Sequence, residues 1–477
     1  MNGQETTLGG KMDAHPRHSA IAYRIRHRWI KLIACIVIAV IAFGAAVAAA
    51  TWLNINGVVQ DNKVESLLEE DEQLDPNSGK PITFVLIGQD TRDGAGNSEI
   101  SGGTAEDAGL HNADTTMVVE IGANREFINL VSIPRDSVVD VPVCRTTNGT
   151  IPAQYGVMFN SIFSTAYREG GNLSSAASCT VSAVNSLTGM HISNFIVVDF
   201  KGLADMIDAL GGVDICIPVD TVDANTELDL KKGLHHLDGV QATNYARMRH
   251  GTGTDGSDIM RTTRQQYLIK ALLDEAISKN LFTQTSQLYQ LALAALSSLN
   301  ISEGMANTNA LMGLAVSLRN LKLDHVYTQT VPVVAAPFDP NRVVWADSAE
   351  EVWKKFREDK PLFGSDSTSS SDESSASPSD DSSSASPSPS ETTPEPSEST
   401  ETSEATNSHS ASPTPTPTVD PKTGLIKEKD GTLIDPETGG VVDPETGSIM
   451  DPDTNQYVGI AYQYLNNTVC AVRSDDK

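Results

Sequence analysis

An uncharged run of twenty-two residues, from Leu32 to Leu53, constrains this chain more than any other feature of its sequence. About 20 apolar residues in a helix cross the hydrocarbon core of a bilayer, so we expect residues 32–53 to form a transmembrane helix. Lys and Arg side chains precede the run, and four consecutive acidic residues follow it at 69–72. The positive-inside tendency therefore predicts a cytoplasmic segment over residues 1–31 and an extracellular remainder, anchored in the plasma membrane by a single pass. A cleaved signal peptide is the alternative, but the run is longer than a usual signal core.

Composition then divides the extracellular part into segments. Residues 364–418 consist almost entirely of Ser, Thr, Pro and acidic residues, with ten acids and no Lys or Arg. Such a segment has too little apolar surface to offset its chain entropy, so we predict a disordered linker. Much of the formal net charge of -28 comes from this linker. The acidic balance argues against nucleic acid as a partner, because phosphate backbones need a basic face.

The remaining segments predict one folded domain with appendages. We expect a stalk over residues 54–80 and an α/β domain over 81–363, with a central mixed β-sheet flanked by helices. The apolar run at 82–88 is typical of a buried strand, and the runs at 115–121 and 126–133 are typical of a hairpin. Helices are predicted at 200–210, 258–280, 283–298 and 348–358, the first from its apolar stripe. Residues 419–477 hold short repeats of the form DPxTG and predict small hairpins.

Four cysteines follow the predicted span, in a compartment where disulfides persist. Three pairings are open, and the sequence alone does not choose among them. We favour Cys144 with Cys179, which flank one loop-rich insertion, and Cys216 with Cys470.

Charged side chains gather where the predicted strands end, which is where α/β folds place ligands. Asp90 and Arg92 follow the buried strand, Asp114 precedes the next strand, and Pro134 ends a strand just before Arg135 and Asp136. Asp90 and Asp114 could pair with arginines or hold Mg²⁺, which prefers one or two carboxylates plus phosphate oxygens. We favour the metal.

A second concentration of charge lies at 241–266. Period-two alternation predicts a strand that presents Tyr245, Arg247 and Arg249 on one face. Beyond a Gly-rich loop, Asp258, Arg261 and Gln265 share one face of a predicted helix. Guanidinium groups clustered in an acidic chain need an anion between them, and a diphosphate suits their forked geometry. We interpret Arg264 and Arg125, in contrast, as partners in exposed salt bridges.

The motifs GQDTR, ADTTMVV, SIPRDS, ALGGVDICIP, NYARMRH and SDIMRTTRQQ occur in this order over about residues 81–361. In that order the chain resembles the LytR-CpsA-Psr family of bacterial cell-wall enzymes. The resemblance implies an Mg²⁺-dependent phosphotransferase that moves a glycopolymer from an undecaprenyl-pyrophosphate carrier to peptidoglycan, at the C6 hydroxyl of N-acetylmuramic acid. It implies that Asp90 and Asp114 hold Mg²⁺, that Asp258 orients the arginines, and that the phosphates are gripped by Arg92, Arg135, Arg247, Arg249, Arg261 and Gln265.

Two other functions stay open at this point. A lipid-pyrophosphate hydrolase would use the same arginines and metal but deliver water instead of a sugar hydroxyl. A non-catalytic scaffold would be anchored in the membrane and thread its Ser/Thr/Pro segment through the wall. The general base is also open between Asp90 and Asp136.

Overall fold

The computed structural model describes a membrane-type helix, a large α/β domain and a small C-terminal β-module. The described residues are 19–68, 73–93, 96–101, 109, 111–278, 285–318, 321–363 and 418–470. All but the last residue of the predicted linker at 364–418 lies outside them.

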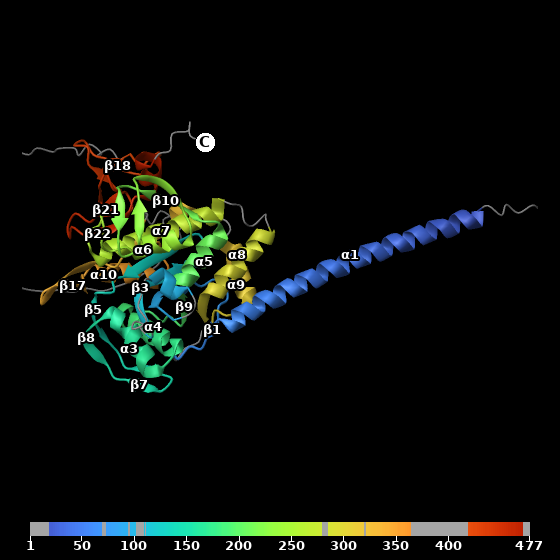
Figure 1. Ribbon diagram of the computed structural model, residues 1–477, viewed down its shortest axis with the longest axis horizontal. Coiled ribbons are helices and arrows are strands. Elements are labelled where there is room, and N and C mark those ends of the chain that lie inside the picture. The colour runs from blue at the N-terminus through green and yellow to red at the C-terminus, as the bar shows by residue number, and fades with distance from the viewer. Residues whose placement is uncertain are drawn as a thin grey trace, which may run out of the picture.

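Helix α1 (Ser19–Asp61) is 43 residues long and extends away from the domain as a single rod (Figure 1). Within its part from Ala34 to Asp61, a window of 18 residues has a mean hydropathy of 2.5, and this part is long and apolar enough to cross a membrane. The end of this helix runs straight into the domain, because β1 (Lys63–Val64) pairs with β14 (Leu299–Ser302) at the edge of the main sheet. Residues 54–64 of the predicted stalk therefore pack as part of the folded body.

A seven-stranded mixed sheet forms the centre of the domain, as predicted. β2 pairs antiparallel with β3 and parallel with β9, and β3 and β4 form the predicted hairpin. In sheet order the strands are β1, β14, β9 (Asn194–Asp199), β2 (Ile82–Thr91), β3 (His111–Ile121), β4 (Ile128–Ile133) and β15 (Val326–Thr330).

Both faces of this sheet are covered. On one face Val118 and Val131 pack with helices α3 (Phe159–Gly170), α4 (Leu173–Thr188) and α10 (Ala349–Arg357). On the other face the alternate residues, such as Met117 and Leu130, pack with α7 (Asp258–Ser278) and α9 (Thr308–Ser317). The central strands therefore read as continuous apolar runs. The remaining helices are α2 (Asn97–Ser101), α5 (Phe200–Leu210), α6 (Gly239–Arg247), α8 (Thr285–Ser298) and the 3₁₀ turn η4 (Leu323–His325).

The predicted strand at Tyr245–Arg249 is wrong. Residues 239–247 form helix α6, which begins with a capping box: the Asp238 side chain accepts from the Gln241 N–H, and the Gln241 side chain accepts from the Asp238 N–H. The alternation in the sequence YARMR spans too few residues to separate a strand from the last turn of a helix. Arg249 lies beyond that turn, in the loop that leads to α7.

Beside the main sheet, the domain has several small two-stranded antiparallel sheets. They pair β5 (Val138–Val141) with β8 (Gln154–Met158), β6 (Cys144–Thr146) with β7 (Gly149–Ile151), β10 (Val213–Ile217) with β13 (Gly233–Leu237), β11 (Thr221–Asp223) with β12 (Leu228–Leu230), and β16 (Val333–Ala336) with β17 (Asp339–Trp345).

The DPxTG repeats form a five-stranded antiparallel meander that packs against α7 and β15. Each repeat supplies a tight turn, and Gly439 and Gly447 adopt the left-handed backbone that these turns require. The strands are β18 (Ile426–Lys427), β19 (Leu433–Ile434), β20 (Val441–Val442), β21 (Ser448–Met450) and β22 (Tyr457–Ile460), followed by α11 (Tyr462–Tyr464) and a turn of π-helix over Leu465–Val469.

The structure pairs the cysteines as the sequence analysis favours. Cys144 bonds Cys179, with the Cα atoms 5.5 Å apart, and Cys216 bonds Cys470 at 5.7 Å. The second bridge ties the C-terminal module to β10 across 254 residues of sequence.

Candidate functional site

The predicted site residues meet beside the ends of β2, β3 and β4, where the N-terminal turn of α7 approaches the sheet. A cavity of about 500 Å³ lies there. It is lined by Asp90, Asp114, Thr115, Arg135, Phe200, Asp223, Asn225, Thr226, Arg247, Arg249, His250, Arg261 and Gln265. Seven of the ten residues predicted from the sequence are in this list; Arg92, Asp136 and Asp258 are not.

Asp114, on β3, binds two arginines at once. Its Oδ1 accepts a hydrogen bond from Arg135 Nη1 at 2.8 Å, and its Oδ2 accepts one from Arg261 Nη1 at 3.2 Å. Arg261 Nη2 also donates to the backbone carbonyl of Asp114 at 2.8 Å. The strand carboxylate thus fixes one arginine from the end of β4 and one from α7.

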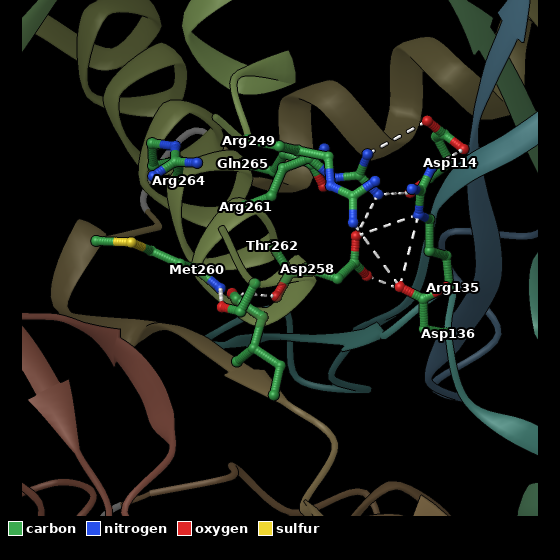
Figure 2. A network of polar contacts seen from close by, with 12 residues as sticks. Asp114, Arg135, Asp136, Arg249, Asp258, Met260, Arg261, Thr262, Arg264 and Gln265 are labelled. Atoms are coloured by element: carbon green, nitrogen blue, oxygen red, sulfur yellow. Dashed lines mark hydrogen bonds and ion pairs between the residues drawn. The ribbon is translucent and has the colours of Figure 1, made fainter. Parts of the chain in front are cut away.

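Asp258 joins the same two arginines from the opposite side (Figure 2). Its Oδ1 lies 2.6 Å from Arg261 Nη2 and 3.5 Å from Arg135 Nε, and its Oδ2 accepts from the backbone N–H of Arg135 at 3.1 Å. Asp258 is itself almost fully buried and stands at the first turn of α7. A negative charge is stabilised there by the helix dipole, so the helix end holds the carboxylate that orients the arginines.

Asp136 has a partner that sequence reasoning missed. Arg342, on β17, donates from Nη1 to Asp136 Oδ1 at 2.9 Å, while Arg135 and Arg249 lie 3.9 Å from Asp136 Oδ2. Arg342 follows Asp136 by 206 residues and matches none of the recognised motifs. Only the tertiary contact between β17 and the start of β5 brings it to the site.

The other predicted residues sit around the cavity wall. Arg247 ends α6, donates to Ile100 O at 2.6 Å, and stacks its guanidinium 4.4 Å from the centre of the Phe200 ring. Gln265 Nε2 donates to Ala246 O at 3.3 Å, which ties α7 to α6. Arg92 follows β2 and affects the site through its charge on Asp90 rather than as part of the wall.

The carboxylates respond differently to this environment. Burial raises the pKa of Asp90 and the nearby charge of Asp114 adds to the rise, while Arg247, Arg92 and Arg261 oppose it. Burial alone would also raise the pKa of Asp114, but Arg261 and Arg135 outweigh it and lower that pKa. Burial and Asp258 raise the pKa of Asp136 against the arginines around it. The negative charge of Asp90 is thus less compensated than that of Asp114.

Several donors of the cluster have no acceptor in the described part of the chain. The buried Nε atoms of Arg135, Arg249 and Arg261 all lack a hydrogen-bond partner there. The Nε atoms of Arg125 and Arg264, away from the cavity, also lack a partner among the described residues, so the gathering of guanidinium groups around one cavity is the stronger sign of an anion. Three such guanidinium groups around one cavity suit an anion with several oxygens.

The predictions for Arg264 and Arg125 are wrong. Both side chains are buried, at 5% and 9% exposed, and both bind backbone carbonyl groups instead of carboxylates. Arg264 donates to Met248 O, and Arg125 donates to Gly122 O, Lys80 O and Pro76 O. Arg264 therefore fastens α7 to the end of α6, and Arg125 closes the β3–β4 turn, where its φ is 62°.

One wall of the cavity was not foreseen. Asp223, Asn225 and Thr226, from the β11–β12 hairpin, and His250 face the arginines across it. The buried Thr226 hydroxyl has no hydrogen-bond partner among the described residues. The segment TVDANTELD is an ordinary turn sequence, so no local signal separates it from the other hairpins.

Comparison with known proteins identifies the family of this chain. The LytR_cpsA_psr family profile matches residues 50–358, so the chain belongs to that family. The match begins within α1, where that helix reaches the domain.

Among curated relatives, a probable cell wall biosynthesis protein, LcpB, from Corynebacterium glutamicum is 29% identical over 56% of this chain and 59% of its own. The polyisoprenyl-teichoic acid–peptidoglycan teichoic acid transferase TagV of Bacillus subtilis is 28% identical over 41% of this chain and 46% of its own. The chain thus spans about half the length of these relatives. The crystal structure of B. subtilis TagV covers 59% of this chain and 98% of its own at 23% identity, with a TM-score of 0.42, too low to support an argument.

Proposed function

We propose that this protein is a membrane-anchored transferase that moves a glycopolymer from a polyprenyl-pyrophosphate carrier to peptidoglycan, with the C6 hydroxyl of N-acetylmuramic acid as acceptor. The observation that carries the proposal is the convergence of four arginines on one cavity: Arg135, Arg247, Arg249 and Arg261. Membership of the family and the names of the relatives support the same class of reaction.

The arginines bind and orient the pyrophosphate. Asp114 and Asp258 hold Arg135 and Arg261 in place before substrate arrives, so little reorganisation is needed when charge develops on the phosphate oxygens. Arg249 and Arg247 face the same cavity and would contact the oxygens on the other side. Positioning and charge stabilisation are the main contributions that a protein makes to phosphoryl transfer.

Asp90 and Asp114 are the carboxylates that would hold Mg²⁺, although Asp114 also has the arginine partners that the sequence offered as the alternative. Each of its oxygens accepts a hydrogen bond from an arginine, so Asp114 would share its oxygens between the metal and the arginines. The two carboxylates lie close enough for the charge of Asp114 to raise the pKa of Asp90, and Mg²⁺ needs only one or two protein carboxylates beside phosphate oxygens. Bound Mg²⁺ would neutralise pyrophosphate charge. Asp90 lines the cavity, whereas Asp136 does not, so Asp90 is better placed to reach the substrate, and as a metal ligand it leaves the general base unassigned.

The apolar helix determines on which side of the membrane the domain lies. We assign the apolar part of α1 to one membrane pass, with the N-terminus cytoplasmic and the domain outside, because Lys and Arg precede it. The donor would reach the cavity from the outer leaflet and the acceptor from the wall.

The test uses the full chain in detergent, a labelled polyprenyl-pyrophosphate oligosaccharide, Mg²⁺ and peptidoglycan glycan strands. We expect labelled glycan strands, and expect Arg249→Ala to reduce their formation by about 10²–10³-fold. Arg168→Ala is the matched control, since Arg168 is 70% exposed on α3. Full transfer by the Arg249 variant would refute the assignment of the site.

The same assay separates the two alternatives. Release of free oligosaccharide phosphate without labelled strands would indicate a hydrolase, and no turnover by the native chain would indicate a scaffold. Calorimetric titration of Mn²⁺ into the native chain and into Asp90→Asn, with pyrophosphate present, tests the metal site without any measure of activity. Equal Mn²⁺ affinity for the two proteins would remove Asp90 as a ligand.

A further inference from the structure

The sequence from 280 to 318 contains one charged residue, Glu303, in a chain of which 20% is charged. This segment holds α8 and α9, and neither helix has a single charged side chain. A surface helix of a soluble domain normally presents charged residues on its outer face. The absence of charge on two successive helices indicates that their outer surroundings are not bulk water.

Helix α9 shows this most clearly. Its inner face, with Ala310 and Leu314, packs into the core beneath the sheet. Its outer face carries Met312 and Val316, which are 53% and 57% exposed. These residues share one stripe with Asn309, because they follow it by three and seven positions. The outer face of α9 is therefore apolar.

The outer stripe of α9 begins at the membrane helix. Trp52, at the end of the apolar run of α1, donates from Nε1 to Asn309 Oδ1 at 3.3 Å. Trp is the residue that most often marks the boundary between hydrocarbon and water. Asn54 donates to the hydroxyl of Tyr289, on α8, at 2.7 Å, two residues further along α1. Both uncharged helices thus contact α1 where it would leave the bilayer.

Hydrogen bonds, an ion pair and strand pairing hold the end of α1 against the domain. Thr308 Oγ1 donates to Asn56 Oδ1 at 3.1 Å, and Gln60 Nε2 donates to Ala306 O at 3.1 Å. Lys63 pairs with Glu303 at 2.8 Å, so the one charge of the segment is neutralised by the residue that follows α1. Because β1 then enters the sheet, the domain has little freedom to swing about its anchor.

We propose that α9, together with the adjoining part of α8, is a second membrane-contact surface. The stripe Met312–Val316 lies on the lipid headgroups and apolar boundary of the outer leaflet, beside the point where α1 leaves the bilayer. The inference rests on the proposed function only in that α1 spans the membrane. α8 also packs on α5, whose Phe200 lines the cavity, so the contact fixes the orientation of the site relative to the lipid.

The experiment measures lipid contact directly in the full chain. In a Cys35→Ser background, spin labels are placed at Met312→Cys and Val316→Cys, and the protein is reconstituted into vesicles of phosphatidylcholine and phosphatidylglycerol. Control labels go to Val334→Cys on β16 and Tyr155→Cys on β8, at positions 41% and 77% exposed. β8, and β17 to which β16 pairs, lie on the side of the domain away from α1 (Figure 1). Collision rates with oxygen, which concentrates in lipid, are compared with those of a water-soluble nickel chelate.

We expect oxygen collisions to dominate at 312 and 316, and nickel collisions to dominate at the two controls. Nickel access at 312 and 316 equal to that at the controls would overturn the proposal by showing a surface that faces water. Few collisions with either reagent would overturn it by showing a surface covered by protein. This readout does not depend on activity, so it can fail while the transferase assignment holds.

A second variant tests the consequence. Met312→Asp with Val316→Asp is expected to slow transfer from a donor embedded in vesicles by about tenfold, as a loss of about 1.4 kcal/mol would. Transfer from a donor in detergent micelles should not change, and Val334→Asp should match the native chain in both. Equal loss in micelles and vesicles would contradict a role at the membrane, and thermal unfolding of the variant checks that the domain is folded.

Discussion

Strand β3 carries two carboxylic acids, Asp114 half-buried and Glu120 fully buried, whose environments have opposite effects. Asp114, near its start, accepts hydrogen bonds from Arg135 and Arg261, and these arginines lower its pKa. Glu120, near its end, is fully buried and has Asn129 as its side-chain partner, and burial raises its pKa to about 8. Burial is common to both, so the placement of cations decides which acid stays charged.

The difference teaches where charge is used in this fold. At the cavity end, arginines from β4 and α7 converge on Asp114, and a charged carboxylate organises donors for an anion. At the far end, the Asn129 amide donates to Glu120 Oε2 at 2.8 Å and to Lys360 O at 2.8 Å, and Glu120 Oε1 has no partner among the described residues. A neutral Glu120 carboxyl suits that end of β3, where Asn129 connects the sheet to the segment after α10.

The largest expected effect comes from removing the charge at the cavity end. Asp114→Asn keeps the shape of the side chain but no longer holds both arginines, so we expect glycopolymer transfer to fall by about 10²–10³-fold. Transfer by purified full chain measures this. Asp229→Asn, at an exposed position on β12, is the control, and comparable rates for the two variants would show that Asp114 does not organise the site.

Asp114→Asn should also change how the free energy of unfolding depends on pH at acid values. The pKa of Asp114 is lowered on folding, so its contribution to stability is present above its ordinary pKa of 3.8 and is lost as pH falls through the folded value. Chemical unfolding at several pH values should show this loss in the native chain and not in Asp114→Asn.

The contribution of Glu120 to stability should depend on pH in the opposite direction. Its folded pKa is raised, so its stabilising effect is complete below about 4.5 and is lost as pH rises toward about 8. We expect the native chain to lose on the order of a few kcal/mol over this interval, and Glu120→Gln to lose much less. A variant with the native pH dependence would show that another group is responsible.

Arg264 extends the comparison to a buried cation. It donates to Met248 O and has no carboxylate partner among the described residues, so its removal should affect folding rather than transfer. We expect Arg264→Met to lower the free energy of unfolding by about 1–3 kcal/mol while the folded protein keeps most of its activity. Arg249→Met, with the reverse pattern, is the matched variant, and a catalytic loss at Arg264 as large as that at Arg249 would return Arg264 to the phosphate site.

The smallest effect is expected at Arg342. Its loss leaves Asp136 with Arg135 and Arg249 as neighbours, so we expect Arg342→Gln to reduce transfer by about two- to tenfold, as the loss of about 0.5–1.5 kcal/mol would. Rates measured with Lys at this position should be closer to native. A loss as large as that of Asp114→Asn would place Arg342 on the substrate.

Much of the fold followed from local pattern. The continuous apolar run at 82–88 and the hairpin at 115–133 are the central strands, because both faces of the sheet are covered. The ordered charged motifs brought most of the site residues to one cavity, since strand ends at one edge of a sheet meet. Where the local signal was short, as at Tyr245–Arg249, helix and strand could not be told apart.

The sequence by itself determined the apolar helix, the mixed sheet, and which carboxylates and arginines gather at the strand ends, because these depend on residue type and spacing. Only the tertiary structure decided which arginines bind carboxylates, that Arg342 reaches Asp136, and that α1 joins the domain directly. The physical reason is that an arginine can donate either to an anion or to a backbone carbonyl. Packing between segments that are distant in sequence determines which partner it binds, and residue spacing alone does not indicate that partner.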